Sequence, residues 1–266
     1  MKTIHPSELS PMQVQMILQT AVSPRPIALA STIDKNGNVN LSPFSFFNLF
    51  SSNPPILIFS PARRVRDNST KDTLHNVLEV PEVVIGNVNF DIVQQVSLSS
   101  TEYETGVDEF IKSGLTKKPA ELVKPPLIAE SPVNFECKVI EVKPLGNEGG
   151  AGNLVICEVL KIHIREEFLN EEGNLDQKKL DLVSRLGGNW YGRTTAETLF
   201  EVPKPLVTKG IGFDQLPSEI RNSKIFTGND LGMLANVEQL PEGNFSADEN
   251  LHLEAQKLLL EGKIEE

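Results

Sequence analysis

Four cationic side chains gather in one short run of this sequence. The run from Ser60 to Thr73 has two carboxylates and four cations: Asp67, Asp72, Arg63, Arg64, Arg66 and Lys71. The whole chain has a formal net charge of -11, so the run is a local exception. Guanidinium groups and helix N-termini both bind phosphate, which makes a phosphorylated cofactor the hypothesis to test. Taken alone, such a run is more typical of a solvated basic loop, and both interpretations stay open here.

The same run predicts the start of a helix. Ser69 or Thr70 can cap free backbone N–H groups, and Leu74 and Val77 begin an apolar period of helical spacing. The cations would then lie at the N-terminal end of that helix.

A second segment mixes aromatic and small polar residues. Between Asn40 and Asn53 four phenylalanines alternate with two serines and an asparagine: Phe44, Phe46, Phe47, Phe50, Ser42, Ser45 and Asn48. A buried core explains the phenylalanines but not the polar residues between them. A flat heteroaromatic ligand needs both, because its rings require apolar contacts and its edges require hydrogen-bond partners. We therefore favour ligand contact over a pure core at this segment.

A third cluster lies between Arg185 and Arg193. It contains the single Trp190 beside Asn189, Tyr191 and three glycines. The end of a helix explains the glycines, whereas the aromatic pair indicates either a lid over a ligand or a core anchor. The sequence leaves these two alternatives open.

Other motifs have ordinary explanations. Gly150-Ala-Gly152 runs directly into a strand, so it predicts a connector between two strands rather than a dinucleotide-binding loop. The histidines have no metal-ligand spacing, and no Gly-x-Ser-x-Gly motif supplies a nucleophile. We therefore predict no catalytic side chain and no metal ligand.

The order of elements predicts antiparallel strands with few helices. Strands are expected in pairs at 26–33 with 39–41, at 55–60 with 82–88, and at 132–144 with 153–165. Helices are expected at 8–19, 91–98, 107–113 and 176–186. This order favours a mainly β fold, a closed or partly open antiparallel barrel with peripheral helices.

The C-terminal part has a different character. Glycines and prolines punctuate residues 206–266, and residues 247–260 predict a last amphipathic helix. The apolar pattern is too sparse to predict a separate core. We expect a barrel domain over 1–205, with 206–266 as an extension packing on the barrel or on a partner subunit.

Composition narrows the class of protein further. No long apolar run and no apolar leader occur, so we expect a cytoplasmic protein without a membrane partner. The pI near 5.0 disfavours nucleic-acid binding and favours small ligands. Cys137 and Cys157 lie in strand-like runs, where free cysteine behaves as a small buried hydrophobe.

These motifs, in this order, resemble the flavin reductase-like, FMN-binding split-barrel family. The likeness rests on five segments, all between about residues 20 and 205: 24–32, 38–48, 53–61, 71–73 and 187–191. The resemblance implies an antiparallel split β-barrel that forms a homodimer, with FMN at the subunit interface and a nicotinamide cofactor, NADH or NADPH, as electron donor.

The resemblance also implies roles for individual residues. Five would border the isoalloxazine and ribityl chain: Ser42, Phe44, Ser45, Phe46 and Asn48. Four would hold the phosphate: Ser60, Arg63, Lys71 and Thr73. Three would close over the flavin or its electron donor: Asn189, Trp190 and Tyr191. Which of Arg63, Arg64 and Arg66 reaches the phosphate stays open.

The resulting hypothesis is an FMN-binding oxidoreductase of the flavin reductase type that oxidises NAD(P)H and reduces flavin or another small acceptor. Hydride transfer to a flavin needs orientation and dipoles rather than an acid or a nucleophile, in agreement with the missing catalytic motifs. The alternative is a flavoredoxin-like electron carrier or flavin-binding protein without nicotinamide turnover. A barrel that binds no flavin is a third possibility.

Overall fold

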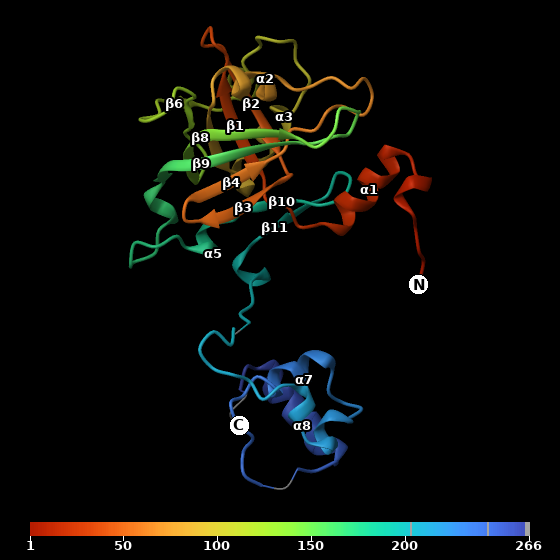
Figure 1. Ribbon diagram of the computed structural model, residues 1–266. Helices are drawn as coiled ribbons and strands as arrows, with labels where there is room; N and C mark the ends of the chain where they lie inside the picture. The colour runs from red at the N-terminus through yellow and green to blue at the C-terminus, as the bar shows by residue number, and fades with distance from the viewer. Residues whose placement is uncertain (203, 244, 264–266) are drawn as a thin grey trace. The chain divides into compact units, whose positions relative to one another are not determined.

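The computed structural model describes residues 1–202, 204–243 and 245–263. The chain divides into two compact units, Met1–Leu199 and Phe200–Glu266 (Figure 1). Each unit is described by itself.

In the described part of unit 1, seven strands form one antiparallel sheet in the order β2-β1-β5-β8-β9-β4-β3. Their bounds are β1 Ala28–Ile33, β2 Val39–Phe44, β3 Phe47–Ser52, β4 Pro55–Phe59, β5 Glu82–Asn87, β8 Val133–Pro144 and β9 Asn153–Ile164. Two small ladders join β6 Lys117–Lys118 to β7 Leu127–Ile128, and β10 Val183–Arg185 to β11 Tyr191–Arg193. A mainly antiparallel sheet with helices was predicted, and that class is confirmed.

Two of the three predicted strand pairs are confirmed. β1 pairs with β2, and β8 pairs with β9 across the glycine-rich connector. The predicted pairing of 55–60 with 82–88 is wrong, because β4 lies between β3 and β9 whereas β5 lies between β1 and β8. The reason is β3, an unpredicted strand inside the phenylalanine-rich segment. It forms the hairpin partner of β4, and the long β8–β9 hairpin separates β4 from β5.

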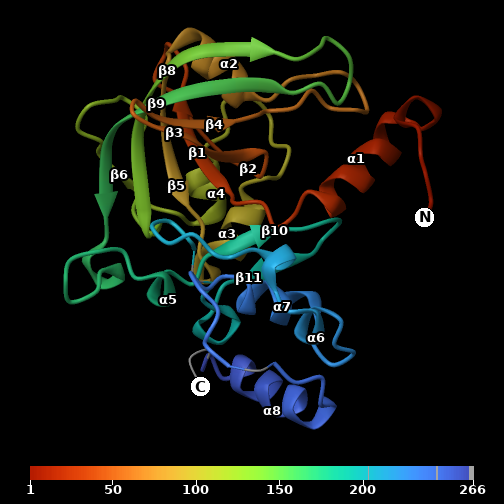
Figure 2. The same ribbon diagram turned by 60° about the horizontal axis from the view of Figure 1, so that its bottom comes forward.

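The sheet must curve because its two edge strands are neighbours in sequence. β2 ends at Phe44 and β3 begins at Phe47, so the Cα atoms of these residues are at most about 11 Å apart. The rings of Phe44 and Phe59 meet with centroids 5.3 Å apart, joining β2 to β4 inside the curve. Figure 2 shows the strands wrapping around this interior. No pairing joins β2 to β3 in the described residues, so the sheet is curved but not closed by hydrogen bonds.

Both faces of the central strands are covered. β1 is buried along its whole length. Ala28 and Ala30 belong to the cluster inside the curved sheet, while Leu29 belongs to a second cluster formed with residues of α3, α4 and the 115–128 segment.

The inner cluster also contains Cys137 and Cys157, which confirms that both are buried free cysteines. Burial, with the neighbouring Glu136 carboxylate, raises the pKa of the Cys137 thiol to about 12.

The helices of unit 1 are α1 Pro11–Ala21, α2 Asp72–Glu79, α3 Val93–Leu98, α4 Glu109–Ser113 and α5 Gln177–Leu180. Short 3-10 turns lie at Pro6–Glu8, Phe90–Ile92, Glu166–Phe168 and Ala196–Thr198.

The prediction of one helix over 176–186 is wrong in its second half. Asp181 takes a left-handed backbone conformation with φ 47°, which ends α5, and β10 follows.

The predicted capping of the helix after the cationic run is also wrong. α2 begins at Asp72 with Lys71 as its N-cap residue, and no side chain caps it. Ser69 and Thr70 are engaged elsewhere, since the Ser69 hydroxyl donates to Asp67 and the Thr70 hydroxyl pairs with His75.

Unit 2 contains α6 Ser218–Arg221, α7 Gly228–Leu234 and α8 Glu249–Leu260, with a 3-10 turn at Phe213–Gln215. The sequence predicted no separate core here, but a small one exists. Its buried members are Leu216, Phe226, Leu231, Ala235 and Leu259. Packing of this extension on the barrel or on a partner stays a prediction. None of the described helices has the length and apolar character needed to cross a lipid bilayer.

Gly86 in β5 tests how tightly the strand is packed. A Cβ at this position would overlap the Ser131 hydroxyl and lie 3.1 Å from Ile128 Cδ1. We expect Gly86→Ala to lower the free energy of unfolding by about 1–3 kcal/mol, because overpacking forces neighbours to move. Urea unfolding followed by circular dichroism measures the change.

A second substitution identifies the cause. The Ser131 hydroxyl is buried without a hydrogen-bond partner in the described residues. Adding Ser131→Ala to Gly86→Ala should therefore recover part of the lost stability. Equal stability of the single and double variants would contradict this packing.

Candidate functional site

A small polar cavity lies where β2, the start of α2 and the 99–103 loop meet. Lys71 reaches into it, and its Nζ donates to Ser42 Oγ at 3.0 Å. The same ammonium group lies 5.3 Å from the centre of the Phe44 ring. Burial, and then the charge of Arg64, lower the pKa of Lys71. An anion in the cavity would oppose both effects, because it favours the charged ammonium group.

Other hydroxyl-bearing residues line the same cavity. Thr73 is fully buried, and its Oγ1 accepts from Asn40 Nδ2 at 2.8 Å. The remaining lining of the cavity includes Ser99, Ser100 and Thr101. Ser42, Lys71 and Thr73, three predicted site residues, are thus brought together. Asn40 was not predicted, although it belongs to the same sequence segment as Ser42.

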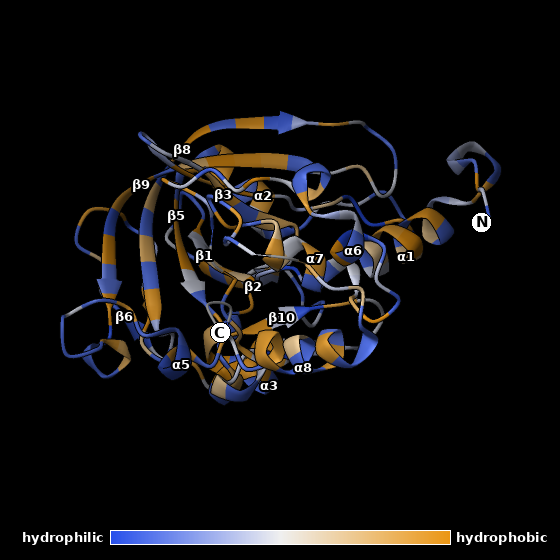
Figure 3. Cartoon of the chain, turned by 90° about the horizontal axis from the view of Figure 1, so that it is seen from below, coloured by the Kyte–Doolittle hydropathy of each residue, from blue (hydrophilic) through white to orange (hydrophobic). Residues whose placement is uncertain are grey.

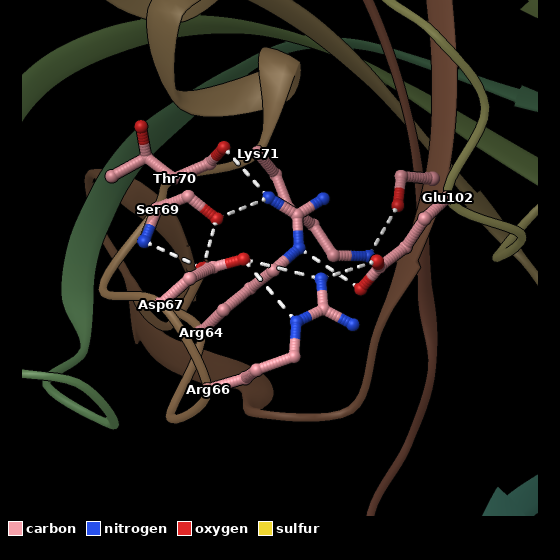
Figure 4. A network of polar contacts seen from close by, with 8 residues as sticks. Arg64, Arg66, Asp67, Ser69, Thr70, Lys71 and Glu102 are labelled. Carbon is pink, nitrogen blue, oxygen red and sulfur yellow. Dashed lines mark hydrogen bonds and ion pairs between the residues drawn. The ribbon is translucent and has the colours of Figure 1, made fainter.

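Among the three arginines of the run, Arg64 lines the cavity (Figure 4). Its guanidinium donates to Ser69 Oγ at 2.9 Å and to the Thr70 carbonyl at 3.1 Å. Arg63 instead donates to the side chain and carbonyl of Asn68, at 2.6 and 3.0 Å, so its guanidinium is held within its own loop. The sequence left the choice among the three arginines open, and the structure places Arg64 at the cavity and Arg63 away from it.

Glu102 is a site residue that sequence reasoning missed. Its carboxylate pairs with Arg64 Nε at 2.9 Å and with Arg66 Nη2 at 3.0 Å. Hydrogen bonds and charge from these two arginines lower its pKa. No local signal in the sequence connects Glu102 to arginines 36 and 38 positions earlier. Only the fold brings this carboxylate to the cations.

Two further carboxylates line the cavity, and both have partners. Glu109 accepts the Leu41 N–H at 2.9 Å, and burial raises its pKa despite that bond. Asp72 accepts from Thr105 Oγ1 at 3.3 Å. The Lys71 ammonium group, by contrast, has no ion pair within the part of the chain that the structure describes.

Ser60 connects the cationic loop to the phenylalanine-rich segment. It is buried at the end of β4, and its N–H donates to the Phe46 carbonyl at 2.8 Å. A Cβ on Gly152 would lie 2.6 Å from Ser60 Oγ, so the glycine-rich connector passes close to it. Ser60 does not line the cavity around Lys71.

The other residues of the phenylalanine-rich segment point in different directions. Phe44 is buried in the inner cluster, whereas Phe46 is 40% exposed beside a hollow bordered by α1. Ser45 Oγ accepts from Arg25 Nε at 3.5 Å. Asn48 is exposed, and its side chain accepts the Leu49 N–H at 2.8 Å. The predicted set is therefore divided between the interior and the surface of this chain.

A second cavity of about 200 Å³ adjoins the first. Its lining consists of Ile27, Pro43, Ser45, Val96, Ser97, Ser100, Arg185 and Tyr191. Ser100 borders both cavities, so they are neighbours. Tyr191 and Ser45, two of the predicted site residues, thus line the same cavity. Asn189 and Trp190 are exposed, Trp190 by 76%, and neither lines this cavity.

Metal chemistry finds no support in the described residues. No three His, Cys, Asp or Glu side chains gather there in a way that could hold a metal ion.

The comparisons with known proteins identify the family. The family model described as "Flavin reductase like domain" matches residues 21–181, so this chain belongs to the flavin reductase-like family. The Halalkalibacterium halodurans protein BH2278 is 37% identical over 208 residues, covering 77% of this chain and 98% of that protein.

Solved structures agree with this assignment. Nitrilotriacetate monooxygenase component B from Bacillus cereus superposes with a TM-score of 0.70 at 27% identity, over 76% of this chain and 98% of that one. Pseudomonas fluorescens 2-nitrobenzoate 2-nitroreductase NbaA gives a TM-score of 0.68 at 28% identity, over 79% and 100%. The chain is therefore similar to a monooxygenase component and to a nitroreductase over about three quarters of its length.

The residues of the two cavities fit a flavin nucleotide. The first offers an ammonium group, a guanidinium group and several hydroxyl groups, the donors that a phosphate accepts from. The second offers apolar side chains, an aromatic ring and serine hydroxyls, the surroundings that a flat ring with polar edges requires.

Glu102 should compete with an added anion for Arg64 and Arg66. Replacing it by glutamine removes the negative charge but keeps the size of the side chain. We expect Glu102→Gln to strengthen binding of inorganic phosphate about two- to fivefold, since exposed ion pairs contribute up to about 1 kcal/mol. Calorimetric titration measures the affinity.

Glu104→Gln is the matched control. Glu104 lies in the same loop, is exposed, and forms no ion pair with any described residue. It should leave phosphate affinity unchanged. A similar gain in both variants would mean that only net charge matters, contrary to this expectation.

Proposed function

We propose that this protein binds FMN and works as an oxidoreductase of the flavin reductase type, taking hydride from NADH or NADPH and reducing flavin or another small acceptor. The observation that carries the proposal is a pair of cavities that share Ser100 in their lining. The first offers Lys71, Arg64 and hydroxyl groups beside carboxylates that the chain itself engages, and the second combines apolar side chains with serines, an arginine and Tyr191. FMN combines a phosphate and a flat ring in one molecule. Membership of the flavin reductase-like family supports the same cofactor.

In this proposal the first cavity takes the phosphate. Lys71 and Arg64 supply positive charge, and Ser42 and Thr73 supply hydroxyl groups. Ser45 and Tyr191 border the ring. Arg63, Ser60 and Phe44 support the surrounding loops and strands, since their hydrogen bonds and ring contacts lie within these elements.

The bound flavin would supply the capacity to accept and pass on a hydride. The chain's own residues would then bind the phosphate, orient the ring and limit access of water. Oxidoreductase names among the similar structures, the 2-nitrobenzoate 2-nitroreductase and the monooxygenase component, support this class of reaction. Dependence on nicotinamide is part of the proposal.

We also propose that two copies of the chain form a dimer. α1 buries none of its residues, and Met12, Met16 and Leu18 are more than half exposed; the helix carries orange, hydrophobic segments in Figure 3. At the sheet edge, Leu49 and Phe50 of β3 are 60% and 63% exposed. A second copy of unit 1 would cover these apolar side chains. Phe46, Asn48, Asn189 and Trp190 of one copy would then lie beside the flavin of the other copy. The curved sheet would then be one split barrel of a cytoplasmic homodimer.

The phosphate site can be tested with two ligands. Lys71→Ala combined with Arg64→Ala should weaken FMN binding by about tenfold or more, because charge-assisted hydrogen bonds contribute about 1.5–3 kcal/mol. Riboflavin lacks the phosphate, so its affinity should change much less. Fluorescence titration measures both affinities.

Lys35→Ala serves as the control, since Lys35 is an exposed lysine paired with Glu79 away from both cavities. Equal losses for FMN and riboflavin in the double variant would place the phosphate elsewhere.

The reaction is tested by NADH and NADPH oxidation with added flavin or ferric acceptors. We expect turnover with at least one donor, measured as loss of absorbance of the reduced nicotinamide. Tight FMN binding without oxidation under any acceptor would reject the reductase and favour the electron carrier. Failure to bind FMN would reject both.

A further inference from the structure

Two arginines near the second cavity have no carboxylate partner. Arg185 lines the cavity, whereas Arg25 is 6% exposed, borders the hollow beside α1 and reaches the cavity-lining Ser45 through its Nε. Neither forms an ion pair with any residue that the structure describes. Buried or half-buried charges are normally paired, since removing them from water is costly. Two unpaired guanidinium groups therefore indicate an anion that the chain itself does not supply.

Arg25 is held rigidly by neutral groups. Its guanidinium donates to the carbonyls of Gln19, Val22 and Leu186, and its Nε reaches Ser45 Oγ. Its backbone pairs with Arg185 in both directions, with N···O distances of 3.0 and 2.9 Å. Arg25 thus fixes the start of β1 against the strand that carries Arg185. Burial, and then the charge of Arg185, lower the pKa of Arg25, so the two cations oppose each other.

Arg185 presents its charge to the cavity. Its guanidinium carbon lies 4.5 Å from the centre of the Tyr191 ring, and one N–H donates to the Gly188 carbonyl at 2.8 Å. A guanidinium group has five N–H donors, and the structure pairs one of them within the described residues. Stacking on the ring fixes the plane of the group and leaves the other donors available.

The position of this charge relates it to the flavin ring. Ser100 lines both this cavity and the first one, so a ligand with its phosphate beside Lys71 would extend its ring toward Arg185. The oxidised ring is neutral. When a reduced nicotinamide transfers hydride, its C–H bond breaks and a new N–H bond forms on the flavin ring. The ring gains the electron pair of the hydride and therefore carries one negative charge.

We propose that Arg185, positioned by Arg25, stabilises this negative charge and makes the site bind reduced FMN more tightly than oxidised FMN. The inference rests on the proposed function, since it requires FMN in these cavities. A fixed cation near developing charge is worth more in a cavity than in water and needs no reorganisation during the reaction. The midpoint potential of the bound flavin then lies above that of free FMN.

The test compares oxidised and reduced FMN on Arg185→Met, which removes the charge and keeps the length of the side chain. Dissociation constants are measured anaerobically by calorimetry, with dithionite as the reductant. We expect the oxidised form to bind within about twofold of the unaltered protein and the reduced form to bind about tenfold more weakly. For a two-electron couple that tenfold change equals a fall of about 30 mV in midpoint potential, which a dye-coupled titration checks independently.

Two further variants define the cause. Arg185→Lys keeps a positive charge and should retain most of the preference for reduced FMN. Arg165→Met removes an arginine that is paired with Glu167 and lines neither cavity, and it should change nothing. An unchanged ratio of the two constants in Arg185→Met, with both forms weakened together or neither affected, would overturn the proposal.

The unaltered protein provides a measurement that does not depend on the folding of any variant. A midpoint potential at or below that of free FMN would also overturn the inference. If FMN does not bind the unaltered protein in either form, the proposed function itself fails, and this result differs from every outcome above.

Discussion

The fold of unit 1 depends on one covalent constraint, the two-residue link between β2 and β3. These strands are the opposite edges of the seven-stranded sheet, yet only Ser45 and Phe46 separate them in sequence. The sheet must therefore curve until its edges meet at this point. The apolar side chains of β1, β4, β5, β8 and β9 fill the interior that results, and their burial stabilises the curvature.

This constraint also positions the candidate site. It fixes Ser42, at the end of β2, opposite the start of α2, where Lys71 donates to it. It places Ser45 beside the buried Arg25 and the cavity that Arg185 lines. The electrostatics follow from the same geometry, because Lys71 and Arg64 face the first cavity and Arg185 faces the second, while the carboxylates of Glu102 and Glu109 are engaged by arginines and a backbone N–H. An acidic chain can thereby leave Lys71 available to an anion.

Sequence reasoning succeeded where the signal was local. The strand pair at 26–33 with 39–41 and the pair joined by the glycine-rich connector were both predicted, and both exist. It failed where partners are distant in sequence. β4 and β5 were paired as neighbours because nothing local indicated that the β8–β9 hairpin lies between them. The choice among Arg63, Arg64 and Arg66 stayed open in the sequence, because adjacent arginines look alike until the loop shows which one turns toward Asn68.

The sequence by itself determined the family, the antiparallel class of the fold and the types of side chain available for a flavin nucleotide. These properties depend on patterns within short segments and on their order along the chain. The tertiary structure decided which segments meet: Lys71 with Ser42, Glu102 with Arg64, and Arg25 with Arg185. Such contacts join residues up to 160 positions apart, and their geometry follows from sheet curvature and core packing, which no local pattern records.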